Sequence, residues 1–228
     1  MYQLHAAVGS SHRILSGLAT SLGLEPVLDV GAAEGYLGRL LEGSGLSVDA
    51  VEPNPTFAGR AHPYYRKLYA APVETVALDE SYGTIVLGDV LEHLSDPLGA
   101  LLLLKRYLKP EGVMLISLPN VAHLSVRLLL LSGRFPPMDR GPLDRTHLHF
   151  YTRSTAEQLL GDAGLRIRSR RATVVPLADI FGGRWRALAV AVQPLQQAGL
   201  RLMPGLFAYQ WVFVASADSR EVGAGQLS

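Results

Sequence analysis

Four short runs of apolar residues mark the first half of the chain. They span residues 27–30, 48–51, 84–87 and 113–118, and helical spacing or turn residues separate them. Continuous apolar runs of this length are typical of strands that are buried on both faces of a parallel sheet. One more strand is expected at residues 67–70, because a half-sheet of βαβ units would otherwise lack a member. The pattern therefore predicts an α/β fold.

Helices are expected before and after these strands. Apolar residues recur at helical spacing over residues 4–23, and a glycine closes this segment. A second helix is expected over residues 154–163, with Ser154 as N-cap and Glu157 completing a capping box. Gly164 is the expected C-cap of this second helix.

The rest of the chain departs from the βαβ rhythm. Residues 120–153 are rich in Arg, Pro and His and contain a helical-looking segment, which predicts an insertion over the carboxyl edge of the sheet. Residues 166–175 and 209–215 are strand-like and predict an antiparallel pair at the sheet edge. Residues 176–207 are expected to form a second, C-terminal insertion, and residues 221–228 a frayed tail.

One part of the second insertion is strongly apolar. The stretch from Trp185 to Met203 is apolar but is broken by Pro194 and Gly199. The four apolar runs and the three further strands expected at residues 67–70, 166–175 and 209–215 make seven strands. We expect these strands to form one domain, residues 1–228. Its expected architecture is a doubly wound, seven-stranded α/β sheet with helices on both faces and an antiparallel edge strand.

Composition agrees with one large buried sheet. The chain has 228 residues, of which 48% are hydrophobic and 18% charged, so it can cover such a sheet with helices and is not disordered. It contains no cysteine, which excludes disulfides, thiolate metal sites and cysteine nucleophiles. The absence of cysteine also fits a reducing compartment.

Charge and hydropathy narrow the partners and the location. A formal net charge of +1 creates no global field that would gather nucleic acid or anionic lipid, although it does not exclude local patches. The N-terminus lacks a basic segment followed by an apolar run, so no signal peptide is expected and the protein is placed in the cytoplasm. Residues 185–203 are interrupted by arginine and glutamine, which favours packing on the sheet or peripheral membrane contact over a membrane span.

The candidate chemistry begins at the end of the first strand. The sequence VLDVGAAEGYLGRLL, residues 27–41, places Gly31 and Gly35 between a strand and an amphipathic helix. Glycines there let the backbone approach a ligand at the carboxyl edge of the sheet. Glu52 follows Gly31 by 21 positions at the end of the second strand, where a carboxylate can accept both hydroxyls of a ribose. The pattern indicates a nucleoside site.

Charge distinguishes between two nucleoside cofactors. A dinucleotide places a pyrophosphate at the helix N-terminus and uses a third glycine for helix packing, and the glycine spacing here is different. Glu34 lies in this loop and would repel a pyrophosphate, whereas a cationic sulfonium meets no such repulsion. The loop therefore favours S-adenosylmethionine over NAD.

The loop and the acid resemble two motifs of class I S-adenosylmethionine-dependent methyltransferases. Asp29, Gly31, Ala33 and Gly35 stand where the first motif has its key positions, and Glu52 where the second has its acid. Ala33 replaces the middle glycine usual in that motif, which tightens the loop slightly. The resemblance implies a Rossmann-like fold in which the loop contacts the methionine part of the cofactor and the acid holds the ribose.

Three later segments extend the resemblance over most of residues 25–165. Residues 82–97 resemble the fourth motif, residues 108–120 the fifth strand with its preceding turn, and residues 145–165 a later segment of methyltransferases of small-molecule, quinone and polysaccharide biosynthesis. The residues expected to bind the cofactor are Asp29, Gly31, Ala32, Ala33, Gly35, Tyr36, Glu52, Pro53, Asn54, Gly88, Asp89, Val90 and His93.

A candidate metal site follows the fourth strand. Asp89, Glu92 and His93 have the spacing of one face of a helical turn, and two carboxylates with an imidazole suit a divalent ion. The arrangement is similar to that of quinone O-methyltransferases and small-RNA ribose methyltransferases that use such an ion. In the RNA enzymes a histidine just before an aromatic-Thr-Arg sequence completes the site, and His147 matches it best, with His149 second.

The same residues have simpler interpretations. Asp89 can cap a helix, Glu92 can pair with an arginine, and His93 can pack with one hydrogen bond. His147 can act as a general base or merely anchor the insertion, with His149 as the second candidate base and Asp89 orienting the acceptor. The sequence leaves these alternatives open.

The sequence as a whole favours methyl transfer from S-adenosylmethionine to an oxygen of a small molecule or saccharide. Such a transfer is an in-line displacement, so the protein must mainly position donor and acceptor and remove a proton. The alternatives are a nicotinamide-dependent oxidoreductase and a cofactor-binding regulatory protein without turnover. Nothing in the sequence identifies the acceptor.

Overall fold

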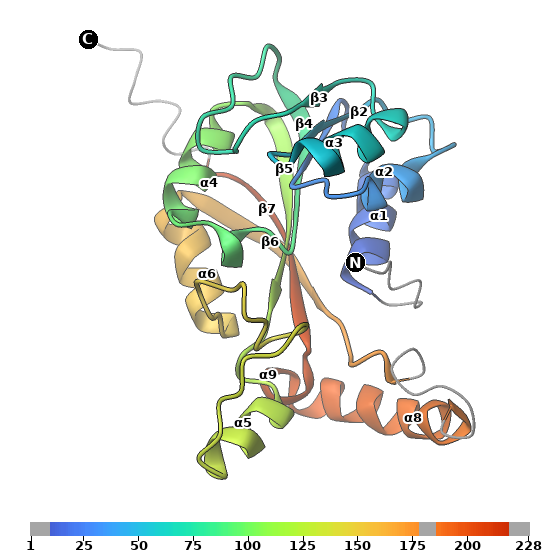
Figure 1. Cartoon of the computed structure of the whole chain (residues 1–228), viewed down its shortest axis with the longest axis vertical. Coiled ribbons are helices and arrows are strands. Elements are labelled where there is room, and N and C mark those ends of the chain that lie inside the picture. Colours follow the sequence, from blue (N-terminus) through green and yellow to red (C-terminus); the bar gives the residue numbers. More distant parts are fainter. Residues whose placement is uncertain (1–9, 178–185, 219–228) are drawn as a thin grey trace.

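The computed structural model describes residues 10–177 and 186–218 and contains one seven-stranded mixed sheet (Figure 1). The strand order is β3-β2-β1-β4-β5-β7-β6. The α/β class and the seven strands predicted from the apolar runs are confirmed. The strands are β1 (Val27–Val30), β2 (Val48–Val51), β3 (Leu68–Tyr69), β4 (Tyr82–Gly88), β5 (Leu108–Pro119), β6 (Leu165–Ala172) and β7 (Gln210–Ala217).

The centre of the sheet is the point where strand order reverses. β1 pairs in parallel with β2 on one side and with β4 on the other, so the chain winds outward in both directions from β1 and β4. In open α/β sheets ligands bind outside the carboxyl ends of the strands at such a switch point. The glycine loop after β1 and the acidic segment after β4 therefore lie at the same edge of the sheet.

The antiparallel edge predicted for the C-terminal half is also confirmed. β7 pairs antiparallel with both β5 and β6, so it lies one position in from the edge strand β6. β6 ends at Ala172, three residues before the predicted end at Val175. Exposed arginines line β6, and charged side chains on an edge strand hinder pairing with another sheet.

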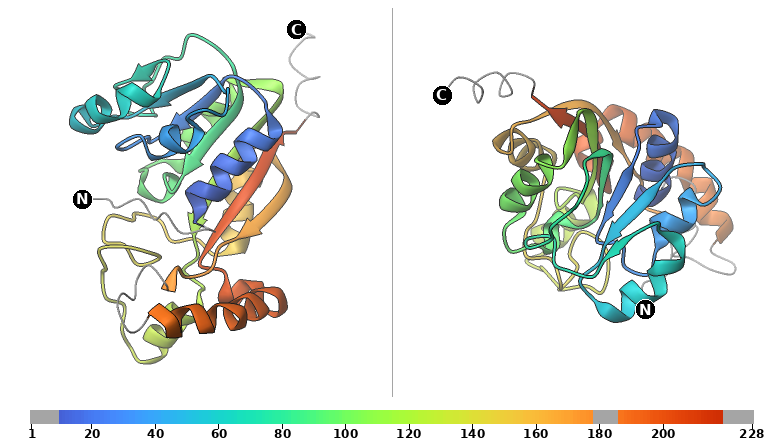
Figure 2. Two further views of the ribbon diagram at one scale, coloured as in Figure 1. Left: turned by 90° about the vertical axis from the view of Figure 1, so that its right-hand side faces the viewer. Right: turned by 90° about the horizontal axis from the view of Figure 1, so that it is seen from above.

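Helices cover both faces of the sheet (Figures 1 and 2). One face packs against α1, α2 and α3, and the other against α4 and α6. Strand residues alternate between these two cores, so Val27 faces α1 while Leu28 faces α4. The helices are α1 (Ser11–Leu22), α2 (Tyr36–Leu41), α3 (Pro55–Ala61), α4 (Pro97–Lys105), α5 (Leu124–Leu131), α6 (Arg153–Asp162), α8 (Arg186–Leu202) and α9 (Pro204–Phe207), with 3-10 turns η1 (His62–Tyr64) and η2 (Leu91–His93).

Within the described residues, the predicted first helix begins at Ser11. Residues 4–9 of the prediction lie outside the described part of the chain. Ser10 is the N-cap of α1, and its side chain accepts a hydrogen bond from the Arg13 amide. Gly23 closes the helix with a left-handed φ of 62°.

The predicted capping box of α6 is wrong in its residues. Thr152, not Ser154, is the N-cap, and Thr155 rather than Glu157 returns the reciprocal hydrogen bond. Thr152 and Thr155 have the same three-residue spacing as the predicted pair but lie two positions earlier, and they cap the helix. Glu157 instead forms an ion pair with Arg170. At the other end Ala163 is the C-cap, and Gly164 follows it with a φ of 68°.

The two segments predicted as insertions lie together beyond the carboxyl ends of the strands. α5 and the loop after it belong to residues 120–153, and α8 and α9 to residues 176–207 (Figures 1 and 2). α8 runs through Pro194 and Gly199, so the predicted breaks are wrong. Proline removes one backbone hydrogen bond, and on this mostly exposed helix water can replace it. Trp185 and residues 221–228 lie outside the described ranges.

Among the described residues, no helix is long and apolar enough to cross a membrane.

The two insertions are joined at Asn120, which is fully buried at the end of β5. Its side-chain amide donates to the carbonyl oxygens of Ala208 (2.7 Å) and Gly205 (3.3 Å), and its backbone amide donates to the carbonyl oxygen of Tyr209 (2.9 Å). The neighbouring Val121 amide donates to the carbonyl of Tyr151 at 2.9 Å. The buried Asn120 side chain thus connects the end of β5 to the second insertion, and the Val121 backbone connects it to Tyr151 at the end of the first.

Candidate functional site

The loop after β1 is held in an unusual backbone conformation. Gly31, Ala33 and Gly35 all have positive φ, at 73°, 47° and 80°. Ala33 is one of two residues other than glycine with positive φ among the described residues, and this conformation costs about 1–2 kcal/mol for an L-residue. The middle position of the loop therefore favours glycine on backbone grounds, and Ala33 is accommodated with some strain.

Glu52 fixes this loop from the end of β2. Its side chain is buried, and its two carboxylate oxygens accept the backbone amides of Ala33 and Asn54, both at 2.8 Å. Each carboxylate oxygen has a second lone pair, so the group can still accept two ribose hydroxyls. The structure thus shows that Glu52 shapes the loop, and its contact with the ribose stays a prediction.

A small cavity lies beneath the loop. Its volume is about 20 Å³, and six residues of the predicted cofactor set line it, together with His12 and Leu15 of α1. His12 was not predicted, because no spacing pattern links α1 to the loop. A larger cavity of about 420 Å³ between α2 and β2 is lined by none of the predicted site residues. The six predicted residues around the small cavity are Asp29, Gly31, Ala32, Ala33, Tyr36 and Gly88.

Glu34 is paired with a cation. Its carboxylate forms an ion pair with Arg60 of α3 and accepts a hydrogen bond from the Tyr36 hydroxyl at 3.4 Å. Arg60 offsets part of the negative charge that the sequence argument placed against a pyrophosphate. The remaining predicted residues, Pro53, Val90 and His93, follow β2 and β4 at the same sheet edge.

Replacing Gly31 with valine is expected to weaken S-adenosylmethionine binding by at least about tenfold. A Cβ at this position would lie 2.7 Å from Cγ2 of Val90, and the φ of 73° disfavours any β-branched residue. A side chain at position 31 would thus disturb the packing of the loop on Val90, in addition to occupying the space expected for the cofactor. Calorimetric titration with the cofactor measures the effect.

Gly43→Val is the matched control for Gly31→Val. Gly43 also has a positive φ, 76°, but a Cβ there meets nothing within 4 Å. This variant is expected to bind the cofactor normally. A folded Gly31→Val protein with wild-type affinity would remove the loop from the cofactor site.

Asp29 is buried in a hydrogen-bond network behind the loop. The Tyr65 hydroxyl donates to Asp29 Oδ2 at 2.5 Å and accepts the Gly38 amide at 3.1 Å. Burial raises the pKa of Asp29 from 3.8 to about 7, and the hydrogen bond from Tyr65 opposes this rise. Gly38 and Tyr65 were not predicted, because their role depends on a contact between α2 and the segment before β3.

The raised pKa of Asp29 predicts a pH dependence of stability. Protonated Asp29 contributes stability that is fully present below its unfolded pKa of 3.8 and is lost as the pH rises through about 7. The free energy of unfolding of the wild type should therefore fall relative to Asp29→Asn between these values, by at most about 1.4 kcal/mol per pH unit. Denaturant titrations across this window measure the difference, and Asp162→Asn, at an exposed aspartate, should keep the wild-type slope. Parallel curves for wild type and Asp29→Asn would contradict the assignment.

Asp89 connects four elements at the carboxyl edge. It has a φ of 58°, and its carboxylate accepts hydrogen bonds from Ser117 (2.7 Å), Gln210 (2.9 Å) and Ser11 (3.1 Å). The start of α1, the carboxyl-terminal part of β5 and the start of β7 thus converge on the residue that follows β4. The cluster described next, whose ligand atoms lie within 4.8 Å of one another, does not include Asp89.

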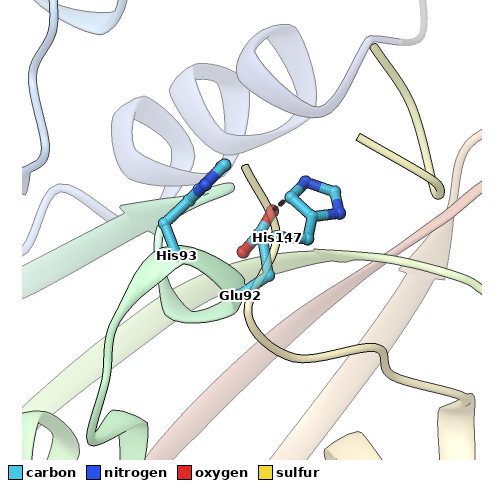
Figure 3. A group of neighbouring side chains, drawn as sticks. All are labelled: Glu92, His93 and His147. Atoms are coloured by element: carbon cyan, nitrogen blue, oxygen red, sulfur yellow. Dashed lines mark ion pairs between the residues drawn. The ribbon is translucent and has the colours of Figure 1, made fainter. Parts of the chain in front are cut away.

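Glu92, His93 and His147 form a compact cluster beyond β4 (Figure 3). One ligand atom from each lies within 4.8 Å of the other two, and Nε2 of His147 is 3.9 Å from Oε1 of Glu92. The side chain of Glu92 is 1% exposed, and neither of its carboxylate oxygens has a hydrogen-bond partner. An unpartnered buried carboxylate is costly, so a cation or a proton donor is expected there.

The insertion reaches this cluster through the backbone of Glu92. The carbonyl oxygen of Glu92 accepts the amides of Leu148 (2.8 Å) and His149 (3.1 Å). Nδ1 of His93 lies 3.2 Å from the carbonyl oxygen of Thr146. These contacts bring His147 to Glu92 across more than 50 residues of sequence. The ring of His149 instead packs on Tyr151, with centroids 6.2 Å apart, and is outside the cluster.

Burial controls the electrostatics of the cluster. It raises the pKa of Glu92 well above its ordinary value, and the charge of Asp89 adds to this rise. Burial also lowers the pKa of His147, with a further contribution from His93. Neutral imidazoles are the form that binds a metal, and a divalent cation would reverse the shift at Glu92.

Aromatic side chains adjoin the cluster. Phe150 lies edge-on to His147, with ring centroids 6.2 Å apart, and edge-on to Phe135 at 5.4 Å. Both phenylalanines come from the first insertion and are partly exposed. Phe150 gives the cluster an apolar side, and Phe135 extends it.

Known proteins resemble this chain in sequence and in fold. The profile of the methyltransferase domain family matches residues 11–170. The ubiquinone biosynthesis O-methyltransferase of Dinoroseobacter shibae is 29% identical over 177 residues, which cover 72% of this chain and 69% of that protein.

Two solved structures share the fold and were crystallised with S-adenosylhomocysteine. One is the 1,6-didemethyltoxoflavin-N1-methyltransferase of Burkholderia thailandensis, with a TM-score of 0.59 and 17% identity over 92% of this chain and 80% of that one. The other is the magnesium protoporphyrin IX methyltransferase of Synechocystis PCC 6803, with a TM-score of 0.61 and 16% identity over 91% of this chain and 84% of that one.

Proposed function

The chain belongs to the methyltransferase domain family and is an S-adenosylmethionine-dependent methyltransferase, and on this premise we propose that its acceptor atom is a hydroxyl oxygen of a small molecule. The relative from Dinoroseobacter shibae is named an O-methyltransferase, which supports an oxygen acceptor. A saccharide remains within this proposal, but Phe150 beside His147, with Phe135 packed on it, favours a phenol or another acceptor with an apolar body.

The observation that carries the proposal is the buried carboxylate of Glu92. Its oxygens have no partner, and two histidines flank it at the edge of the sheet where the acceptor must meet the donor. An oxygen acceptor must lose a proton during transfer, and a group that removes or weakens that proton is needed there. Glu92, His93 and His147 are the residues placed to do this.

The donor set fits a divalent metal ion. Glu92, His93 and His147 offer one carboxylate and two imidazoles, a combination used for borderline divalent ions. Such an ion would lower the pKa of a bound hydroxyl. We propose these three residues as its ligands, without Asp89, whose oxygens are used by Ser11, Ser117 and Gln210.

Without a metal ion, His147 is the residue that would remove the proton. Its side chain is 5% exposed and approaches Glu92, which can orient it. His149 is the second candidate, and its packing on Tyr151 makes it the weaker one. In both versions Asp89 positions β4, β5, β7 and α1 around the acceptor.

The donor side is assigned to the loop after β1. S-adenosylmethionine supplies a methyl group that its sulfonium already activates, so the protein need only hold it in line with the acceptor. Glu52 would bind the ribose, and Gly31 and Ala33 would let the backbone lie close to the methionine part. Phe135 and Phe150 would exclude water from the acceptor side. These assignments place donor and acceptor on opposite sides of the β1–β4 switch point.

A labelled-donor screen tests the proposal. The purified full chain is incubated with methyl-labelled S-adenosylmethionine and matched acceptors that carry a hydroxyl, an amine or an activated carbon on the same aromatic ring, with saccharides and RNA ends in parallel. Transfer to the hydroxyl compounds is the expected result. Transfer only to the amine, carbon or RNA acceptors would overturn the oxygen assignment and leave the cofactor assignment intact.

A further inference from the structure

Exposed apolar side chains concentrate at one end of the molecule. Among the described residues, 13 large hydrophobic side chains are exposed, and 11 of them lie in the two insertions. Both insertions lie beyond the carboxyl ends of the strands (Figures 1 and 2). Contiguous exposed apolar patches mark interaction sites more often than isolated residues do. The eleven are Leu128, Leu130, Leu131, Phe135, Met138, Leu148, Phe150, Val190, Leu195, Leu202 and Met203.

α8 contributes an uninterrupted apolar stripe. Ala191, Leu195, Ala198 and Leu202 recur at helical spacing, and all four are exposed. Leu195 is 70% exposed and Leu202 is 80% exposed. The half-buried side of the helix is a different one, which includes Val192, Gln196 and Gly199. The stripe therefore faces away from the protein's own core.

The first insertion presents a similar surface. All residues from 131 to 140 are exposed, including Leu131 at 84%, Phe135 and Met138. Arg134 and Arg140 lie in the same stretch, and Arg127 precedes it on α5. Leucine, phenylalanine and methionine interspersed with arginine are typical of segments that bind at a membrane interface.

The net charge of this end is positive, whereas that of the rest of the chain is negative. Residues 120–153 and 186–209 together carry seven arginines and only two aspartates, although the whole chain has 21 basic and 20 acidic residues. One of these aspartates, Asp144, is buried. The rest of the chain therefore has four more acidic than basic residues. The molecule has a cationic, apolar end and an acidic remainder.

We infer that this end docks on the surface of an anionic lipid bilayer. The exposed leucines and phenylalanines would enter the interface, and the arginines would bind lipid phosphates. The charge pattern disfavours a second copy of this chain as the occupant. Each copy carries an excess of five positive charges at this end, so two copies would repel each other there. An anionic lipid surface complements both the charge and the apolar side chains.

Docking would orient the acceptor side toward the bilayer. Phe150 belongs to the exposed apolar set and lies beside His147, so the surface is continuous with the proposed acceptor site. If the function proposed above holds, the acceptor is a lipophilic hydroxyl compound that enters from the membrane. Docking itself does not depend on that function, so the two are measured separately.

Vesicle flotation tests the inference. The full chain is mixed with vesicles of phosphatidylcholine alone or with about one third phosphatidylglycerol, and the floated fraction is measured. Binding to the anionic vesicles and a strong decrease at high salt are expected. The double variant Leu195→Gln, Leu202→Gln should lower the partition coefficient about tenfold or more, because two leucines no longer enter the interface. Arg127→Gln with Arg134→Gln should lower it about tenfold as well.

Two matched variants control for unspecific effects. Leu22→Gln with Leu102→Gln changes exposed leucines at sites outside the two insertions, and Arg166→Gln with Arg171→Gln changes exposed arginines of β6. Both should float like the wild type. Failure to float, or equal loss in test and control pairs, would overturn the inference. So would a dimer in sedimentation that the Leu195, Leu202 variant dissociates, because the stripe would then bind a second copy. Calorimetry with S-adenosylmethionine on each variant shows separately whether the donor site is intact.

Discussion

Methyl transfer is expected to fall by about 10²- to 10⁴-fold when His147 is replaced by alanine, while the affinity for S-adenosylmethionine changes little. His147 belongs to the proposed acceptor side and not to the predicted donor contacts, which follow β1, β2 and β4 and include its neighbour His93. The loss should therefore appear in kcat and not in the Kd of the cofactor. Single-turnover assays with labelled donor and calorimetry on the same preparation measure the two quantities.

A chelator distinguishes the two roles proposed for His147. If the cluster holds a metal ion, chelation should imitate His147→Ala, and His93→Ala should have a similar effect. If His147 is a general base, chelation should have no effect and His93→Ala only a small one. His149→Ala is the control on the same loop and should be mild, because His149 packs on Tyr151. Full activity of both the chelated enzyme and His147→Ala would reject both roles.

Replacing Glu52 with alanine is expected to weaken cofactor binding by roughly 10²- to 10⁴-fold. Two hydrogen bonds from ribose hydroxyls to a charged acceptor contribute about 1.5–3 kcal/mol each. The variant also removes the acceptor for the Ala33 and Asn54 amides, so the strained loop loses its support. Calorimetric titration with S-adenosylmethionine measures the change in Kd.

Two further variants separate the contributions of Glu52. Glu52→Gln keeps one acceptor oxygen and should lose part of the affinity, whereas Glu42→Ala, at an exposed glutamate just after α2, should lose none. Wild-type affinity in Glu52→Ala would exclude Glu52 from the donor site. Equal losses in Glu52→Ala and Glu52→Gln would indicate that the charge matters more than the number of acceptors.

The strands were predictable because burial on both faces leaves a continuous apolar run. β1, β2, β4 and β5 each contain such a run, and the structure places all four in the centre of the sheet. Helix boundaries were less predictable, since several polar residues can serve as a cap. At α6 both Ser154 and Thr152 offer a hydroxyl, and only the folded chain shows that Thr152 is used.

The site was predictable where its residues follow the carboxyl ends of adjacent parallel strands. The glycine loop and Glu52 follow adjacent parallel strands, so their proximity follows from the fold class. Asp89 was expected to join Glu92 and His93, but its partners come from α1, β5 and β7, which no local spacing reveals. The same holds for His12 and Tyr65, whose contacts span distant segments. The cytoplasmic location stays a prediction.

Asn120 makes the two insertions thermodynamically linked. The buried side-chain amide of Asn120 donates a hydrogen bond to the backbone just before β7, and the backbone amide of Val121 donates one to Tyr151. A large movement of either insertion would therefore break hydrogen bonds that also hold the other. A ligand that orders one insertion then favours the ordered state of the other, and the coupling free energy between two such ligands is reciprocal. Acceptor binding beside His147 and lipid binding along α8 should therefore each raise the affinity for the other. Asn120→Ala is expected to uncouple them while leaving the donor loop unchanged.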